Sequence, residues 1–356
     1  MKLLRVLAFP FTFLYGSIVR VRNYLYDKNI FRSNRFDSPV IGIGNLSVGG
    51  TGKTPHIEYL IRLLKTEGIE IAVLSRGYKR LSKGYVEAID ESTIWDIGDE
   101  PKQIKNKFKN EVTVAVDSNR VRGIAELFGK TSPPDVVLLD DCLQHRAIDP
   151  GLKILLTDYQ SPYCEDYLLP SGNLREPRCG ADRADIIIVT KTPKVLSPLE
   201  VRRIHSELKV KEHQQLFFSS ISYGGIHPLF DDEEPITDLN QVDEILLVTG
   251  IANPTYLLNY LETFKLKIKH LKYRDHYAFM KKDLMTIREA FEGLSSNKKL
   301  ILTTEKDAMR IIDHKFNDIV NEFPFYFQEI EITLRENREE FDKRILDYVR
   351  EHKRND

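Results

Sequence analysis

The feature that most constrains this chain is a glycine-rich segment between a short apolar run and an amphipathic one. The segment reads Ser47-Val48-Gly49-Gly50-Thr51-Gly52-Lys53-Thr54. It matches the phosphate-loop (P-loop) pattern G-x-x-x-x-G-K-[ST], except that serine stands at the first position. Residues 40–44 are predicted as a strand and residues 54–67 as a helix. This order predicts a nucleotide-binding α/β domain, with a tight turn that binds no ligand as the alternative.

Each conspicuous residue of the segment has a chemical role in such a site. The glycines let backbone N–H groups turn toward phosphate oxygens, and the N-terminus of the following helix adds its dipole. Lys53 is expected to reach the β- and γ-phosphates, and the Thr54 hydroxyl to bind Mg²⁺. We therefore predict that residues 47–54 bind a nucleoside triphosphate.

Two aspartates can supply the metal-binding carboxylate that a P-loop requires. Asp140 and Asp141 follow the apolar run 136–139. They would lie at the carboxyl end of a later strand, where open α/β sheets bind their ligands. Either residue alone could instead cap a helix or form a turn. Together with the P-loop, the pair predicts a Mg²⁺ site.

The sequence favours ATP over GTP as the nucleotide. A guanine pocket usually carries the pattern N/T-K-x-D. Residues 190–193 read Thr-Lys-Thr-Pro, with proline where aspartate is needed. Residues 304–307 read Thr-Glu-Lys-Asp, in which the order is wrong.

The rest of the chain alternates short apolar runs with helical ones. Such alternation indicates a doubly wound α/β domain with a parallel sheet. A second strand–helix series follows the extended stretch 216–229, and the run 325–332 is expected to return and pair with 216–222. Two domains also suit a length of 356 residues. We therefore predict a P-loop domain over 28–215, and a linker with a smaller α/β domain over 216–356.

The N-terminal segment departs from the average composition. Its longest uncharged stretch has 14 residues, fewer than the roughly 20 that a spanning helix needs. As a helix, it carries a narrow polar stripe in an apolar surface, which is typical of helices in a bilayer interface. Basic residues follow at Lys28, Arg32 and Arg35 and would favour anionic head groups. Residues 1–27 are therefore predicted as an amphipathic membrane-interface helix; docking on the protein's own core is the alternative.

Composition excludes several other classes of protein. A net charge of −1 leaves no electrostatic signature of nucleic-acid binding. The three cysteines, Cys142, Cys164 and Cys179, form no C-x-x-C pair. They argue for a reducing compartment and against a disulfide framework or a cysteine zinc site.

Three further residues are suited to phosphoryl transfer. Asp99, in the segment Gly98-Asp99-Glu100-Pro101, could accept the proton of an acceptor hydroxyl, although these four residues are also typical of a turn in a long loop. His276 follows a predicted strand and could share a proton with a carboxylate, or be structural. Arg175 could neutralise a phosphate, or form a salt bridge within its loop.

These motifs together resemble the tetraacyldisaccharide 4′-kinase family, the lipid A 4′-kinases. The resemblance covers nearly the whole chain and keeps the family's order of segments. The segments are residues 44–55, 74–78, 98–101, 139–146, 169–177, 249–254, 275–276 and 303–308. Two departures concern loop geometry: Cys142 stands where many members have glycine, and Ser171-Gly172-Asn173 replaces the commoner Ala-Gly-Pro.

The resemblance implies ATP- and Mg²⁺-dependent phosphorylation of the 4′-hydroxyl of a lipid-linked glucosamine disaccharide 1-phosphate. It implies a peripheral or monotopic protein on the cytoplasmic face of the bacterial inner membrane, with no obligate protein partner, and two α/β domains joined by a short β linker. It implies Asp99 as catalytic carboxylate with His276 as its partner. Phosphate and metal positions of the family fall on Lys53, Thr54, Asp140, Asp141, Arg175 and Glu176.

A different class remains as the alternative, namely a membrane-associated P-loop nucleotide switch or ATPase that acts through a protein partner. Such proteins often carry a lysine early in the loop, where this chain has Val48. A soluble small-molecule kinase is disfavoured by the N-terminal helix.

Overall fold

The structure, a computed structural model, describes residues 8–230, 236, 238–312, 320, 322–335 and 337–353. Its larger part, here called the first half, has a sheet that is parallel except at the short edge strand β3. The strands are β1 (Val40–Asn45), β2 (Ile71–Ser75), β3 (Val86–Glu87), β4 (Thr113–Val116), β5 (Val136–Asp140), β6 (Leu152–Asp158) and β7 (Ile186–Thr190).

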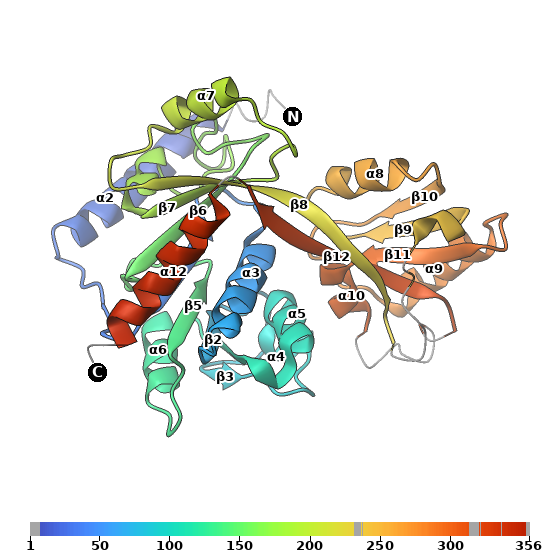
Figure 1. Cartoon of the computed structure of the whole chain (residues 1–356), viewed down its shortest axis with the longest axis horizontal. Helices are drawn as coiled ribbons and strands as arrows, with labels where there is room; N and C mark the ends of the chain where they lie inside the picture. The colour runs from blue at the N-terminus through green and yellow to red at the C-terminus, as the bar shows by residue number, and fades with distance from the viewer. Residues whose placement is uncertain are drawn as a thin grey trace.

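Helices cover both faces of this sheet (Figure 1). They are α2 (Phe9–Asp27), α3 (Lys53–Thr66), α4 (Ile94–Ile97), α5 (Asp99–Phe108), α6 (Arg120–Phe128), α7 (Pro198–Leu208) and α12 (Arg338–Lys353). Ile41 and Val73 belong to a core with α3, α5 and α12, whereas Leu74 and Leu139 belong to a second core with α6. The strands are buried on both faces, which is why they appear in the sequence as continuous apolar runs.

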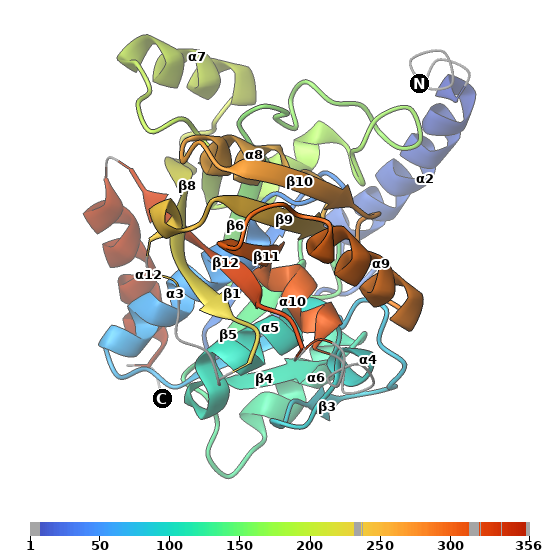
Figure 2. The ribbon, with the colours of Figure 1, turned by 90° about the vertical axis from the view of Figure 1, so that its right-hand side faces the viewer.

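The second half is a smaller parallel sheet with its own core. It contains β9 (Glu244–Thr249), β10 (Lys267–Lys272), β11 (Lys299–Thr304), α8 (Thr255–Glu262), α9 (Lys281–Glu292) and α10 (Glu305–Ile311). Leu246, Ile301 and Ile287 lie in the core between this sheet and α9. Figure 2 shows this half from the side, in front of the first half.

Two long strands, β8 (Gln215–Pro228) and β12 (Phe325–Leu334), connect the halves. They pair antiparallel, with Ile332 opposite Ile221, which confirms the pairing expected from the sequence. β8 also pairs with β7, and β12 with β11, so one sheet runs through the molecule in the order β10-β9-β11-β12-β8-β7-β6-β1-β5-β2-β4-β3. The fold is therefore mixed α/β with a large, mostly parallel sheet, as Figure 1 shows.

The C-terminal helix α12 returns to the first half, although the sequence analysis grouped it with residues 216–356. Phe341, Ile345 and Val349 are buried in the core that contains Ile41 and Ile43. The Tyr348 hydroxyl accepts a hydrogen bond from the Val40 N–H and donates one to the Val40 carbonyl, both at 3.1 Å. The grouping is corrected accordingly: the apolar face of this highly charged helix completes the larger core.

The segment around Asp99 is helical rather than a long loop, which corrects the prediction for residues 98–101. Helix α4 begins after the capping residue Thr93 and ends at Gly98, whose φ of 93° is in a region that favours glycine. Asp99 then starts α5, with Pro101 in the first turn, where proline lacks no intrahelical hydrogen bond. Asp99 and Glu100 also interact favourably with the helix dipole there.

The N-terminal helix α2 contacts the protein through its polar stripe. Its buried residues are Thr12, Gly16 and Asn23. Phe13 and Ile18, on the apolar surface, are 74% and 60% exposed. Residues 1–7 of the predicted helix lie outside the described residues. No helix of the described part of the chain is both long and apolar enough to cross a bilayer.

A buried charge cluster joins α3, α5 and β12 to α10 of the second half. The Lys107 Nζ atom lies 2.8 Å from Glu58, 3.1 Å from Glu305 and 2.7 Å from Glu329. Burial and the nearby Glu58 charge raise the pKa of Glu305 to about 7, although Lys107 acts in the opposite direction. Burial likewise raises the pKa of Glu58, against the charge of Lys107.

This cluster predicts a pH dependence of stability. A carboxyl group with a raised folded-state pKa binds its proton more tightly in the folded protein, so stability falls as pH rises from about 4.5 to about 7. The glutamine of a Glu305→Gln variant cannot ionise, so its stability should fall less over this pH range. The measurement is the free energy of unfolding in urea at several pH values. The exposed Glu339→Gln should leave the fall in stability unchanged. Parallel curves for Glu305→Gln and the wild type would contradict the prediction.

Candidate active site

A cavity of about 530 Å³ lies between the two halves. The glycine-rich loop and the carboxyl end of β5 line it from the first half, and α8, α10 and the segment after β10 line it from the second. Ile221, Tyr223, Ile330 and Ile332 of the crossing strands also line it. The sequence-predicted residues that line it are Ser47 to Thr54, Asp140, Asp141, Arg175 and His276.

The glycine-rich loop connects β1 to α3 and presents backbone to the cavity. Gly49 and Gly52 have φ values of 114° and 87°, in the left-handed region that glycine tolerates. No side chain in the described part of the chain caps the N-terminus of α3, so its first N–H groups are available to a ligand. The buried Thr51 hydroxyl has no hydrogen-bond partner among the described residues. Free donors at a helix N-terminus form a site for a phosphate anion.

One carboxylate oxygen of Asp140 accepts no hydrogen bond from any residue that the structure describes. The Ser75 hydroxyl donates to its Oδ2 at 3.2 Å, and its buried Oδ1 has no partner. Burial and the negative charge of Glu100 raise the pKa of Asp140 to about 7, although Lys53 opposes the shift. A cation bound here would therefore relieve an unfavourable burial of charge.

Asp141 is paired with two cations of the site. Arg175 donates to both of its oxygens at 2.7 Å, and Lys53 lies 3.5 Å from Oδ1. Burial would raise the pKa of Asp141, but the hydrogen bonds from Arg175 and the charge of Lys53 hold it below its usual range. Arg175 thus forms its ion pair with Asp141 and not with its neighbour Glu176.

Glu176 lies outside the cavity and is held by other groups. Arg183 donates to its two oxygens at 2.9 and 2.8 Å. Gln144 and Asn23 donate to it at 3.1 and 3.2 Å. Glu176 therefore anchors α2 to its loop, and we do not include it among the proposed metal ligands.

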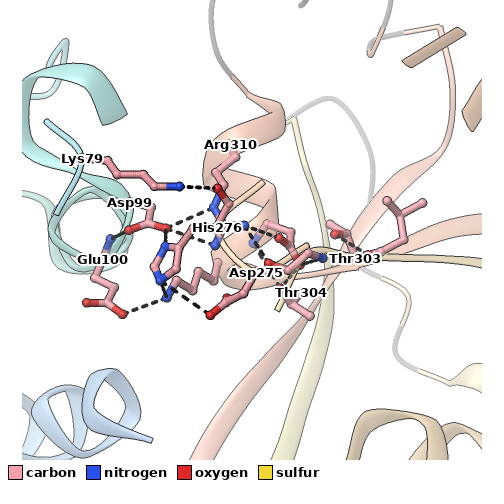
Figure 3. A network of polar contacts seen from close by, with 12 residues as sticks. Lys79, Asp99, Glu100, Asp275, His276, Thr303, Thr304 and Arg310 are labelled. Carbon is pink, nitrogen blue, oxygen red and sulfur yellow. Dashed lines mark hydrogen bonds and ion pairs between the residues drawn. The ribbon is translucent and has the colours of Figure 1, made fainter. Parts of the chain in front are cut away.

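Asp99 and His276 meet across the boundary between the halves (Figure 3). The His276 Nδ1 atom is 2.8 Å from Asp99 Oδ2, and Arg310 of α10 donates to the same oxygen at 3.1 Å. Burial would raise the pKa of Asp99, but the hydrogen bond with His276 and the charges of Lys306 and Arg310 hold it well below its usual range. His276 lines the cavity, and Asp99 lies behind it.

The backbone of His276 is held in an unusual conformation. Its φ is 53°, uncommon for a residue with a side chain. The His276 N–H donates to the Gly250 carbonyl at 3.1 Å, and Lys79 of the first half donates to the His276 carbonyl at 3.1 Å. Figure 3 shows the contact of Lys79 with His276. Such conformations persist where the surroundings fix them, often at functional sites.

Comparisons with known proteins agree with the family resemblance found in the sequence. The family profile described as Tetraacyldisaccharide-1-P 4′-kinase matches residues 4–350. The tetraacyldisaccharide 4′-kinase of Bacteroides thetaiotaomicron is 47% identical over 98% of this chain and 94% of its own length. That of Flavobacterium johnsoniae is 44% identical over 99% of each chain. A crystal structure of LpxK from Aquifex aeolicus in complex with ATP matches with a TM-score of 0.75 and 28% identity, over 97% of this chain and 99% of that one.

The chain belongs to the tetraacyldisaccharide 4′-kinase family. It is therefore a kinase, and the nucleotide-switch alternative is not favoured. The glycine-rich loop lines the cavity from the first half and His276 lines it from the second, with Asp99 of the first half hydrogen-bonded to the ring.

Sequence reasoning missed several residues that this kinase brings to the site. They are Arg76, Glu100, Gln103, Lys306 and Arg310. Lys306 and Arg310 are four residues apart on α10 and so share one helix face, a signal that was present in the segment 303–308. Glu100 and Gln103 were hidden because their helix α5 was taken for a loop.

Replacing the buried Asp99 by asparagine is expected to lower turnover strongly, although the change in shape is small. Asp99→Asn keeps the shape of the side chain but removes the charge that orients His276. Turnover should fall by roughly 10²–10⁴-fold, the usual effect of losing general-base catalysis, while ATP affinity changes little. Steady-state kinetics and nucleotide titration measure both, with the exposed Asp37→Asn as control. Near-normal turnover would remove Asp99 from this role.

Proposed function

We propose that this protein transfers the γ-phosphate of ATP to the 4′-hydroxyl of a lipid-linked glucosamine disaccharide 1-phosphate. The observation that carries the proposal is the Asp99–His276 pair, which adjoins the same cavity as the P-loop. A kinase needs a triphosphate site and a proton-accepting group within reach of one another. The P-loop and Asp99 lie in the first half and His276 in the second, so bringing the halves together would assemble the site and exclude water.

Residues 47–54 would bind the triphosphate, with Lys53 on the β- and γ-phosphates. Thr54, Asp140 and Asp141 would hold Mg²⁺, which neutralises charge on the phosphates when bound. The unpartnered Oδ1 of Asp140 supports this ligand set. Arg175 would act through Asp141, to which it is bonded, and stabilise the charge of that carboxylate.

The acceptor hydroxyl would lose its proton to the Asp99–His276 pair. The pKa of Asp99 is held well below its usual range, so this carboxylate would accept a hydrogen bond from His276 Nδ1–H and leave the free electron pair of the ring on Nε2. We place the proton on Nε2, with Asp99 stabilising the imidazolium that forms. The expectation from the sequence had made Asp99 itself the immediate acceptor. Because His276 lines the cavity and Asp99 lies behind the ring, we favour His276 as the group that accepts the proton.

The N-terminal helix supports a membrane-bound acceptor. Thr12 donates to Ser171 at 2.7 Å and Tyr15 donates to the Arg175 carbonyl at 2.6 Å, so α2 is fixed beside the active site by its polar stripe. Its exposed apolar face is left to contact another apolar phase. We propose that this face binds the cytoplasmic surface of the bacterial inner membrane as a peripheral or monotopic anchor.

A group of arginines suits the anionic 1-phosphate of the acceptor. Burial lowers the pKa of His145, and the charges of Arg120, Arg22 and Arg76 lower it further. Arg22 belongs to α2, and Arg76 lines the cavity. Arg22 of α2 and Arg76 of the cavity both act on His145, so we expect the charged head group to enter near these arginines.

Transfer of label tests the function directly. With γ-labelled ATP and purified disaccharide 1-phosphate lipid, label should move to the lipid, and Lys53→Ala should abolish the transfer. Labelled free phosphate without labelled lipid would contradict the proposal. Turnover that required a protein partner instead of the lipid would favour a nucleotide switch.

The exposed face of α2 predicts a second outcome. Phe13→Asp combined with Ile18→Asp adds charge to the outward face and leaves the polar contacts of α2 intact. Binding to anionic lipid vesicles should fall at least tenfold in a sedimentation assay, because burying each charge is costly. The matched control is Leu81→Asp with Ile89→Asp, at exposed apolar positions away from α2. Equal binding by both double variants would refute the anchor.

A further inference from the structure

Lys306 occupies a position that the proposed chemistry does not explain. It is the second residue of α10 in the second half, and its side chain lines the cavity. Its Nζ atom donates to Glu100 Oε1 at 2.9 Å and lies 3.3 Å from His276 Nε2. This ammonium therefore stands between the catalytic ring and a carboxylate of the first half.

The contact with His276 conflicts with proton transfer. The other ring nitrogen, Nδ1, is engaged with Asp99 at 2.8 Å. An ammonium group has only donors, so Lys306 can bond Nε2 only through the electron pair that would receive the proton. An acceptor hydroxyl must displace Lys306 before it can donate to Nε2. In the structure as it stands, the lysine covers the proton-accepting atom.

The neighbouring charges indicate where the displaced ammonium would move. Burial would raise the pKa of Glu100, but the charges of Lys306 and then Lys53 lower it. Glu100 thus lies under the influence of both lysines, and Lys53 is the P-loop residue assigned to the β- and γ-phosphates. A terminal phosphate beside Lys53 would offer Lys306 a stronger acceptor than a neutral imidazole nitrogen.

We propose that Lys306 leaves His276 when ATP is bound and donates to the terminal phosphate of the triphosphate. The proposal rests on the proposed function and adds one contact that ADP cannot make. One movement then frees the proton-accepting nitrogen and adds positive charge to the group being transferred. Arg310, one turn later on α10, holds Asp99 meanwhile, so the helix remains attached to the catalytic pair.

The test is the ratio of ATP to ADP affinity, measured by titration calorimetry with Mg²⁺ and without lipid. Lys306→Met should weaken ATP binding roughly 10–100-fold, the usual effect of one charge-assisted hydrogen bond, and ADP binding less than about twofold. Lys306→Arg keeps the charge and should restore most of the ratio. The exposed Lys282→Met on α9 is the matched control and should leave the ratio unchanged.

Two results would overturn the proposal. If Lys306→Met weakens ATP and ADP equally, the lysine only maintains the shape of the site. If neither affinity changes, it does not contact the nucleotide. Should Lys306→Met fail to fold, Lys306→Gln gives the same comparison. A wild-type protein that transfers no label to lipid, yet loses ATP preference in Lys306→Met, would refute the acceptor and leave the lysine contact standing.

Discussion

The arrangement of the two halves depends on the contacts that the buried Asp99 carboxylate makes. Asp99 belongs to the first half, and its partners His276 and Arg310 belong to the second. A buried carboxylate is stable only when cations and hydrogen-bond donors surround it. The charge of one residue therefore ties the position of the second half to the proposed catalytic pair. The glycine-rich loop lies wholly in the first half, so neither half alone contains the whole candidate site.

The sequence could predict those features that depend only on residues close together in the chain. The P-loop and the strand ending at Asp140 are contiguous signals, and both strand boundaries were predicted to within a residue or two. Contacts between distant segments could not be predicted in this way. Arg175 pairs with Asp141 rather than with the adjacent Glu176 because strand order, which the sequence does not state, brings their segments together. The return of α12 to the first core was missed for the same reason.

The N-terminal helix shows a second limit of sequence reasoning. Its pattern defined a polar stripe and an apolar surface, but not which of them would contact the protein. An apolar face normally packs inward, because burial of apolar surface stabilises the fold. Here the stripe is buried through Thr12 and Asn23, and the apolar face is exposed. Hydrogen bonds of Thr12 with Ser171 and of Asn23 with Glu176 select this orientation, and these pairs are 159 and 153 residues apart in the chain.

The contacts between the halves differ in kind from those within them. Each half has its own apolar core, whereas side-chain contacts across the boundary include the ion pairs Lys107–Glu305, Lys306–Glu100 and Arg310–Asp99. When the halves separate, water hydrates both partners of each pair, so opening costs less than losing one partner would, and these contacts can break and form again. The β8–β12 ladder stays paired through its backbone. A site that must admit a nucleotide, exclude water and release two products needs this combination of a fixed strand pair and an interface of exchangeable charges.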